Sequence, residues 1–296
     1  MTKRYGSLTA VDDLSFTAQS GRVTGFLGPN GAGKTTTLRM ATGLIRPNAG
    51  QASFNGKHYL ALDKPMRHVG LALEPAVFHP GRSALNHLLM LAPYAGVSRE
   101  RCLEVLGLVG LSDVADKRVG KFSLGMRGRL NLAGALLGDP SILLLDEPVN
   151  GLDPEGIRWI RELLRTLANQ GRTVLISSHL LSEVQQTVDD LVIIAHGRTV
   201  YQGTLEQLEA TSGEQVGVVT SDVAGLTALA RQLGWQIVAS PGASEHPGQL
   251  VLAGVTINQI AATMTQAGIP IGGIAPMSNN LESIFLSLTE GQGGMR

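Results

Sequence analysis

This chain is poor in cysteine and carries no excess charge of either sign. With Cys102 as its single cysteine it cannot form an intrachain disulfide, which is typical of a reducing compartment. Cys102 lies in a helix-like run, where a small buried apolar residue is expected rather than a reactive thiol. The 24 basic and 24 acidic residues give a formal net charge of zero, which argues against a protein whose main partner is nucleic acid.

Long apolar segments are also missing. The most apolar runs, 142–145 and 191–195, are long enough for strands but far short of the roughly 18 residues that a membrane span needs. The N-terminus lacks the apolar segment of a secretory signal peptide. We therefore expect a cytoplasmic protein, which would work at a membrane only by docking on another subunit.

The most informative segment that is present is rich in glycine and ends in a lysine followed by threonine. It matches Gly-x-x-x-x-Gly-Lys-[Ser/Thr], the loop that wraps a nucleotide triphosphate. Glycines let consecutive backbone N–H groups turn inward around an anion. Lys34 would place its charge on the β- and γ-phosphates, and the Thr35 hydroxyl would bind Mg²⁺. The matching residues are Gly28, Pro29, Asn30, Gly31, Ala32, Gly33, Lys34, Thr35 and Thr36.

The segments on either side of this loop support the same interpretation. Residues 22–27 form an apolar-rich run suited to a buried strand, and residues 36–41 predict the start of a helix. The motif requires this order of strand, loop and helix, and the helix would direct the positive end of its dipole at the phosphates. A chance match to the motif alone, somewhere in a chain of this composition, is on the order of one per cent.

Strand-length apolar segments alternate with helix-length segments as far as about residue 200. This alternation predicts an α/β fold with a mostly parallel sheet and helices on its faces. Residues 81–137 carry helical patterns and no clear strand, so they are expected to form a helical insert between two strands. The expected core strands are 21–27, 69–73, 142–145, 173–177 and 191–195.

From about residue 213 the pattern changes. The order strand, helix, strand, strand, helix, strand predicts a small ferredoxin-like α+β domain. We therefore expect a nucleotide-binding domain over residues 1–212 and a C-terminal accessory domain over residues 213–296. The expected strands of the accessory domain are 215–219, 235–239, 249–253 and 269–275, and its expected helices are 224–233, 257–266 and 281–288.

A second candidate for nucleotide chemistry is the apolar run at 142–145, which is followed by two acids, Asp146 and Glu147. A buried strand here would deliver Asp146 to the sheet edge beside the phosphate loop, where it would help to hold Mg²⁺ through water. Glu147 would then lie near the γ-phosphate and would orient or deprotonate the attacking water. The alternative is a strand capped by two solvated carboxylates, and the upstream phosphate loop weakens it.

Two weaker signals gain meaning only from this context. Ser123 is a good N-cap for the helix-like run at 129–137, and Gly125 allows a close backbone approach, but alone they indicate an ordinary helix start. His179 follows the expected strand at 173–177, where a histidine can hydrogen-bond a phosphate oxygen. A lone histidine is more often structural.

Together these residues resemble the ATP-binding cassette of ABC transporters, over residues 1 to about 210. Six elements occur in the family's order, which makes the match specific. The resemblance gives a role to Tyr5, as the aromatic residue that stacks on adenine, and to Asn150–Asp153, as the loop that crosses a dimer interface. The other elements are the phosphate loop at 28–36, the signature segment at 123–127, the acidic strand at 142–147 and the switch histidine in Ser178–His179.

The resemblance implies a P-loop NTPase cassette that uses ATP and Mg²⁺ and pairs head to tail with a second copy. Each ATP would lie between one phosphate loop and the partner copy's signature helix. Closure and separation of the pair would drive an integral-membrane permease, docked near residues 77–79 at the cytoplasmic face of the membrane. The implied catalytic residues are Lys34, Glu147 and His179, the implied metal ligands are Thr35, Glu74 and Asp146, and the implied signature contacts are Ser123 and Gly125.

The chain departs from the usual family pattern at two functional positions. The family usually has glutamine where this chain has Glu74, and Leu-Ser-Gly-Gly-Gln where it has Phe-Ser-Leu-Gly-Met at 122–126. Both departures are similar to those of the bacitracin-type exporter branch, and the ending at 281–289 resembles the closing helix of daunorubicin-resistance cassettes. These likenesses favour export of a drug, antibiotic or lipid-like substrate. A third difference is that only four residues precede Tyr5, where cassettes normally carry a strand.

Two other functions compete with transport. A non-transport ABC ATPase that acts on nucleic acid or ribosomes would share the nucleotide site. Such proteins usually show two cassettes in one chain, coiled-coil arms, zinc cysteines or strong basic charge, and this sequence has none of these features. No nucleic-acid partner is therefore expected. The other reading is a regulator with little hydrolysis, prompted by Glu74 and Leu124.

Overall fold

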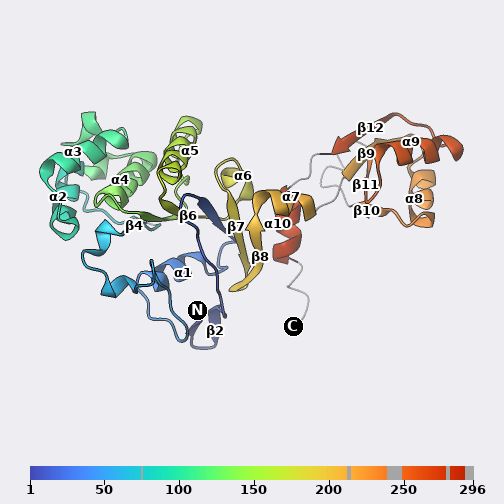
Figure 1. The fold of residues 1–296 in the computed structure, drawn as a ribbon. Coiled ribbons are helices and arrows are strands. Elements are labelled where there is room, and N and C mark those ends of the chain that lie inside the picture. Colours follow the sequence, from blue (N-terminus) through green and yellow to red (C-terminus); the bar gives the residue numbers. More distant parts are fainter. Residues whose placement is uncertain (75, 212–214, 239–248, 278–280, 291–296) are drawn as a thin grey trace. The chain divides into compact units, whose positions relative to one another are not determined.

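The computed structural model describes residues 1–74, 76–211, 215–238, 249–277 and 281–290 (Figure 1). The chain divides into two compact units. The first comprises Met1–Leu205 together with the segment that begins at Phe285, and the second comprises Glu206–Ile284. The functional boundary between residues 212 and 213 stays a prediction.

The first unit is built on a six-stranded sheet with the order β4-β5-β6-β3-β7-β8. Its first five strands in this order are parallel, and β8 pairs antiparallel with β7. All residues of β3 and β5 are buried, because a parallel sheet is covered on both faces. The five expected core strands are therefore confirmed. The bounds are β3 Val23–Leu27, β4 Val69–Ala72, β5 Ile142–Asp146, β6 Thr173–Ser178, β7 Asp190–Ala195 and β8 Arg198–Thr204.

Helices cover both faces of this sheet (Figure 1). On one face, α1 (Lys34–Ala41) buries Leu38 in a core shared with β3, β5, β6 and β7. On the other face, α5 (Pro154–Asn169) buries one apolar side, and the short α6 (Leu181–Val184) follows β6. The Asp153 side chain begins α5 by accepting a hydrogen bond from the Gly156 N–H at 2.8 Å, with Pro154 at the first position of the helix.

The helical insert expected between β4 and β5 is present. Figure 1 shows its helices together beside β4. Ser83 and Ser123 cap its first and last main helices by accepting hydrogen bonds from Asn86 N and Met126 N, each at 3.2 Å. Cys102 is fully buried, as expected. The elements are α2 Ala84–Ala95, α3 Arg99–Leu108, η3 Ser112–Val114, η4 Val119–Lys121 and α4 Leu124–Leu136.

Short elements complete the first unit. At the N-terminus β1 (Lys3–Tyr5) and β2 (Leu8–Val11) form an antiparallel hairpin that the sequence analysis did not anticipate. Between α1 and β4 lie two single-turn helices, η1 (Tyr59–Ala61) and η2 (Pro65–Arg67). Among the described residues, no helix is long and apolar enough to span a bilayer.

The second unit has the predicted ferredoxin-like arrangement. Its four strands are all antiparallel in the order β10-β11-β9-β12, and α8 and α9 pack against the sheet around Val218 and Leu252. The last strand begins four residues later than expected, at Gly273, and part of the expected 235–239 strand lies outside the described residues. Its elements are β9 Gln215–Val219, α8 Val223–Gln232, β10 Gln236–Val238, β11 Gln249–Ala253, α9 Ile257–Gln266 and β12 Gly273–Met277. Two helices span the boundaries between the units, α7 Leu205–Thr211 and α10 Leu281–Glu290.

Candidate functional site

A cavity of about 370 Å³ opens where β3, β5 and β6 end. Parallel strands bring their carboxyl ends to one edge of a sheet, so the loops that follow them meet there. Ten site residues predicted from the sequence line this cavity, together with Asn150 of the predicted loop at 150–153 and Ala10. The full lining is Ala10, Asn30, Gly31, Gly33, Lys34, Thr35, Thr36, Glu74, Asp146, Glu147, Asn150 and His179.

Two glycines of the phosphate loop, Gly28 and Gly33, are packed too closely against neighbouring backbone to be replaced by larger residues. A Cβ at Gly28 would lie 2.4 Å from the Ile194 carbonyl oxygen. A Cβ at Gly33 would lie 2.5 Å from the Ala10 carbonyl oxygen, and the φ of Gly33 is +106°. Glycine is therefore required at both positions, and the loop is fixed between β7 and β2.

Lys34 is buried at the floor of the cavity. Its Nζ donates hydrogen bonds to the carbonyl oxygens of Gly28 at 2.7 Å and Pro29 at 3.4 Å, and it lies 3.4 Å from Glu147 Oε1. These contacts hold the ammonium group inside the curl of the loop. Because α1 begins at Lys34, the side-chain charge and the positive end of the helix dipole both face an anion placed here.

Asp146 forms a buried network of hydroxyl groups. The Thr35 hydroxyl donates to Asp146 Oδ2 at 2.7 Å, and the Ser177 hydroxyl donates to Oδ1 at 2.5 Å. A carboxylate beside a threonine hydroxyl supplies the hard oxygen ligands that Mg²⁺ prefers, and Glu74 adds a second carboxylate to the same cavity. This donor set fits Mg²⁺.

Ser177 was missed as a functional residue because it was counted only as the end of a core strand. It is fully buried, and its Oγ also accepts a hydrogen bond from the Glu147 N–H at 3.0 Å. Glu147 has a φ of +50°, a strained conformation for a residue with a side chain, and this hydrogen bond helps to hold it. The register of β5 and β6 pairs Asp146 with Ser177. A serine ending a strand parallel to the acidic one was the available signal.

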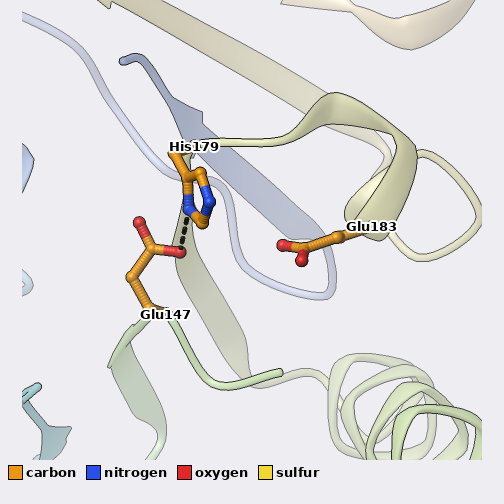
Figure 2. Close-up of side chains that lie close together, drawn as sticks. All are labelled: Glu147, His179 and Glu183. Atoms are coloured by element: carbon orange, nitrogen blue, oxygen red, sulfur yellow. Dashed lines mark hydrogen bonds and ion pairs between the residues drawn. The ribbon is translucent and has the colours of Figure 1, made fainter. Parts of the chain in front are cut away.

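Glu147 and His179 face one another (Figure 2), with His179 Nδ1 3.0 Å from Glu147 Oε2. Glu147 is nearly buried, so each carboxylate oxygen is fixed by one basic group, Lys34 on one side and His179 on the other. Glu183, which the sequence did not single out, approaches from α6 in Figure 2. Its Oε2 accepts a hydrogen bond from the Ser178 hydroxyl at 2.8 Å, which ties α6 to the end of β6.

Glu74 lies on the exposed rim of the cavity. Partial burial, followed by the negative charges of Asp146 and Glu147, raises the pKa of Glu74 above its ordinary value. A neutral glutamine at this position would lack this repulsion. The departure from the usual family residue therefore makes the rim of this site more acidic.

Six predicted residues do not line this cavity. Three of them, Gly28, Pro29 and Ala32, belong to the phosphate loop itself, and the other three lie elsewhere in the chain. Tyr5 is exposed on β1, with the Lys3 ammonium 5.0 Å from its ring centroid. Ser123 is exposed at the start of α4, and Gly125 lies in the first turn of that helix. The N-cap predicted at Ser123 is confirmed, but Ser123 is not among the residues that line the cavity of its own chain.

Comparison with known proteins identifies the family. The ABC transporter family model matches residues 11–150. The bacitracin transport ATP-binding protein BcrA of Bacillus licheniformis is 42% identical over 225 residues, which cover 75% of this chain and 74% of that protein. The chain belongs to the ABC transporter ATP-binding family. It is an ABC ATPase, and the nucleotides of its family are ATP and ADP.

Other relatives agree in function class and in fold. The lantibiotic transport ATP-binding protein SrtF of Streptococcus pyogenes is 36% identical over 220 residues, which cover 73% of this chain and 95% of that protein. A solved dimeric cassette in a post-hydrolysis state, bound to ADP and Pi, is 25% identical with a TM-score of 0.62 and covers 69% of this chain and 95% of that one. The expected likeness to the bacitracin-type branch is therefore confirmed.

The Ser177 hydroxyl makes a testable contribution to the ABC ATPase. Replacing it in Ser177→Ala removes one hydrogen bond from Asp146 and the acceptor of the Glu147 N–H. We expect the Mg²⁺ concentration for half-maximal ATPase activity to rise about tenfold, as is common when the group that orients a metal ligand is lost. A magnesium titration of ATPase activity measures this. Ser7→Ala, at an exposed turn, is the control, and an unchanged titration in Ser177→Ala would remove Ser177 from the site.

The raised pKa of Glu74 predicts a pH-dependent effect on ATP binding without metal. The carboxylate repels the phosphates only when it is ionised, so the repulsion is present above its raised pKa and is lost as the pH falls through that pKa. With EDTA present, Glu74→Gln should bind ATP about threefold more tightly than the wild type at pH 8, and the two should converge at acidic pH. Fluorescent ATP binding across this pH range measures the difference. Equal affinities at pH 8 would contradict the prediction.

Proposed function

We propose that this ABC ATPase is the subunit that powers export of a drug, antibiotic or lipid-like substrate through a separate permease at the cytoplasmic face of the membrane. The observation that carries the proposal is the buried Glu147 carboxylate, held between Lys34 and His179 in the nucleotide cavity. The export assignment is supported by relatives named for transport of bacitracin and of lantibiotics.

Lys34 and the phosphate loop bind the triphosphate of ATP in this proposal. The ammonium group meets the β- and γ-phosphates while the loop N–H groups and the start of α1 surround them. Thr35 and Asp146, with Glu74 at the rim, hold Mg²⁺. When bound, the metal ion neutralises charge that develops on the phosphates.

Glu147 orients the attacking water and accepts its proton. Its two oxygens are fixed by Lys34 at 3.4 Å and His179 at 3.0 Å, so the carboxylate is positioned before the substrate arrives. His179 contacts a γ-phosphate oxygen with the ring edge that Glu147 does not engage. Tyr5, exposed on its hairpin, stacks on adenine.

A second copy completes the site. Ser123 and Gly125 stand at the N-terminus of the 13-residue helix α4, where the dipole favours an anion, yet they do not line the cavity of their own chain. A head-to-tail partner would bring this helix terminus to the γ-phosphate. The similar cassette that was solved as a dimer bound to ADP and Pi supports this arrangement.

The permease docks next to the helical insert. Val77 is 88% exposed, and Phe78 beside it packs its ring against His87 at 4.9 Å. An exposed aliphatic residue anchored by a packed aromatic neighbour, followed by His79, offers an apolar contact at the surface. The zero net charge and the transport relatives disfavour the alternative of an ATPase that acts on nucleic acid or ribosomes. The regulator with little hydrolysis is disfavoured because Glu147 is fully supported by its neighbours.

The role of Glu147 is tested by Glu147→Gln, which keeps shape but removes the base. We expect ATP hydrolysis to fall about 10³-fold while ATP binding persists and an ATP-dependent dimer accumulates. Phosphate release and analytical ultracentrifugation measure these outcomes. Lys34→Ala is the contrasting variant, since it should lose nucleotide binding itself. Hydrolysis that survives in Glu147→Gln would show that another group is the base.

Membrane association tests the transport assignment. Expressed together with a permease that it powers, the chain should sediment with membranes, and expressed alone it should stay in the supernatant. Val77→Asp should lower the membrane-bound fraction about tenfold, because a charge would have to be desolvated at the contact. Leu60→Asp, at a 79% exposed leucine of η1 outside the predicted site, is the control. A chain that never co-sediments with a permease would contradict the proposal.

A further inference from the structure

In this chain the signature turn, residues 123–125 at the start of α4, packs against the loop at 150–153. Leu124, the first residue of α4, sits directly on Gly151: a Cβ at Gly151 would lie 2.3 Å from Leu124 Cδ2 and 2.6 Å from Cγ. At the next position, a Cβ at Gly125 would lie 3.4 Å from both the Gly151 carbonyl oxygen and Leu152 Cδ2. Leu124 therefore touches the loop, and Gly125 leaves room only for ordinary van der Waals contact with it.

Leu124 and Gly151 are complementary in shape. The φ of Gly151 is +72°, so a residue with a side chain would be strained there as well as colliding with Leu124. The glycine leaves the space that the leucine occupies. Leu124 is 61% exposed, and the buried part of its side chain is the part that lies against Gly151. A displacement of either segment toward the other therefore meets this contact.

A second contact holds the same two segments further along the chain. The Arg129 guanidinium of α4 lies 4.7 Å from the centre of the Trp159 ring of α5, within the range of a cation–π interaction. The start of α4 thus rests on the loop, and its second turn rests on the helix that follows the loop. The two elements are joined at two places.

The contact between Leu124 and Gly151 lies between Asn150, at the nucleotide cavity, and Ser123, at the signature turn. On one side, the Asn150 N–H donates to the Glu147 carbonyl oxygen at 3.1 Å, and Asn150 lines the nucleotide cavity. On the other side is Ser123, which caps α4 and lies outside that cavity. Leu124 and Gly151 form the contact between them.

We propose that Leu124 is a positioning residue that couples the nucleotide cavity of its own chain to the signature turn. The inference rests on the proposed head-to-tail dimer, in which Ser123 reaches the nucleotide of the second copy. Movement of the turn at 147–151 on ATP binding or hydrolysis is then passed through Leu124 to Ser123, so that the two nucleotide sites of the dimer respond to one another. The usual glycine of the signature has no side chain, so it could not make this contact with the loop.

The test uses the full-length chain with its permease. Leu124→Ala should lower kcat about tenfold and bring the Hill coefficient for ATP close to 1, while ATP affinity of the isolated chain stays within about twofold of the wild type. Leu124→Met should restore most of both, because it refills the contact. Leu108→Ala, another half-exposed leucine in the helical insert, is the matched control and should change neither.

A spectroscopic readout separates coupling from activity. The chain has two tryptophans, so Trp235→Phe leaves Trp159 as the only one. In this background, ATP should change Trp159 emission, and Leu124→Ala should remove most of that change. Gly151→Ala should lower kcat strongly alone but much less when combined with Leu124→Ala, since the collision is then absent.

The outcomes distinguish a failure of the coupling role of Leu124 from a failure of the proposed dimer. A cooperative wild type, with Leu124→Ala indistinguishable from Leu108→Ala in Hill coefficient and Trp159 response, overturns the coupling role and leaves the proposed function intact. A wild type that binds ATP without cooperativity or dimer formation overturns the proposed dimer, and the coupling role with it. Strict additivity of Leu124→Ala and Gly151→Ala would also overturn the coupling role.

Discussion

The buried carboxylate of Asp146 is the group on which the site depends. It accepts one hydroxyl hydrogen bond from the start of α1 and one from the end of β6, so it joins the phosphate loop to the centre of the sheet. The register that pairs Asp146 with Ser177 makes this possible. A slip of one residue between β5 and β6 would turn Asp146 to the opposite face of the sheet and would separate it from Thr35.

The site could be predicted from the sequence wherever its chemistry is local. The phosphate loop, the acidic end of β5 and the Ser123 cap each occupy a few consecutive residues, so their residue types reveal them. The contacts of Ser177 and Glu183 depend on which strands become neighbours, and the order β5-β6-β3 cannot be deduced from any one segment. The late start of β12 has a local cause, since Pro270 and Gly272 interrupt the apolar run that suggested a strand from residue 269.

The departures from the usual family pattern have different physical effects. Glu74 adds a carboxylate to a cavity that already holds two acids and one lysine, so it makes the site more dependent on a bound cation. Leu124 adds apolar volume at a signature position, and Gly151, which belongs to a different motif, leaves the space for it. The first departure acts through charge at the rim. The second acts through packing between Leu124 and Gly151, which lie too far apart to fall in one window of roughly 11 to 18 residues, the window in which periodicity is read.

The return of the chain to its first unit at Phe285 has a consequence for how the second unit can be removed. The second unit, Glu206–Ile284, is therefore inserted between two segments of the first unit and is not appended after it. Phe285 and Thr289, in the segment that follows it, are buried. Cutting the gene short would therefore strip the cassette of its own final helix, whereas excising the second unit and rejoining its flanks with a flexible bridge would leave that helix in place.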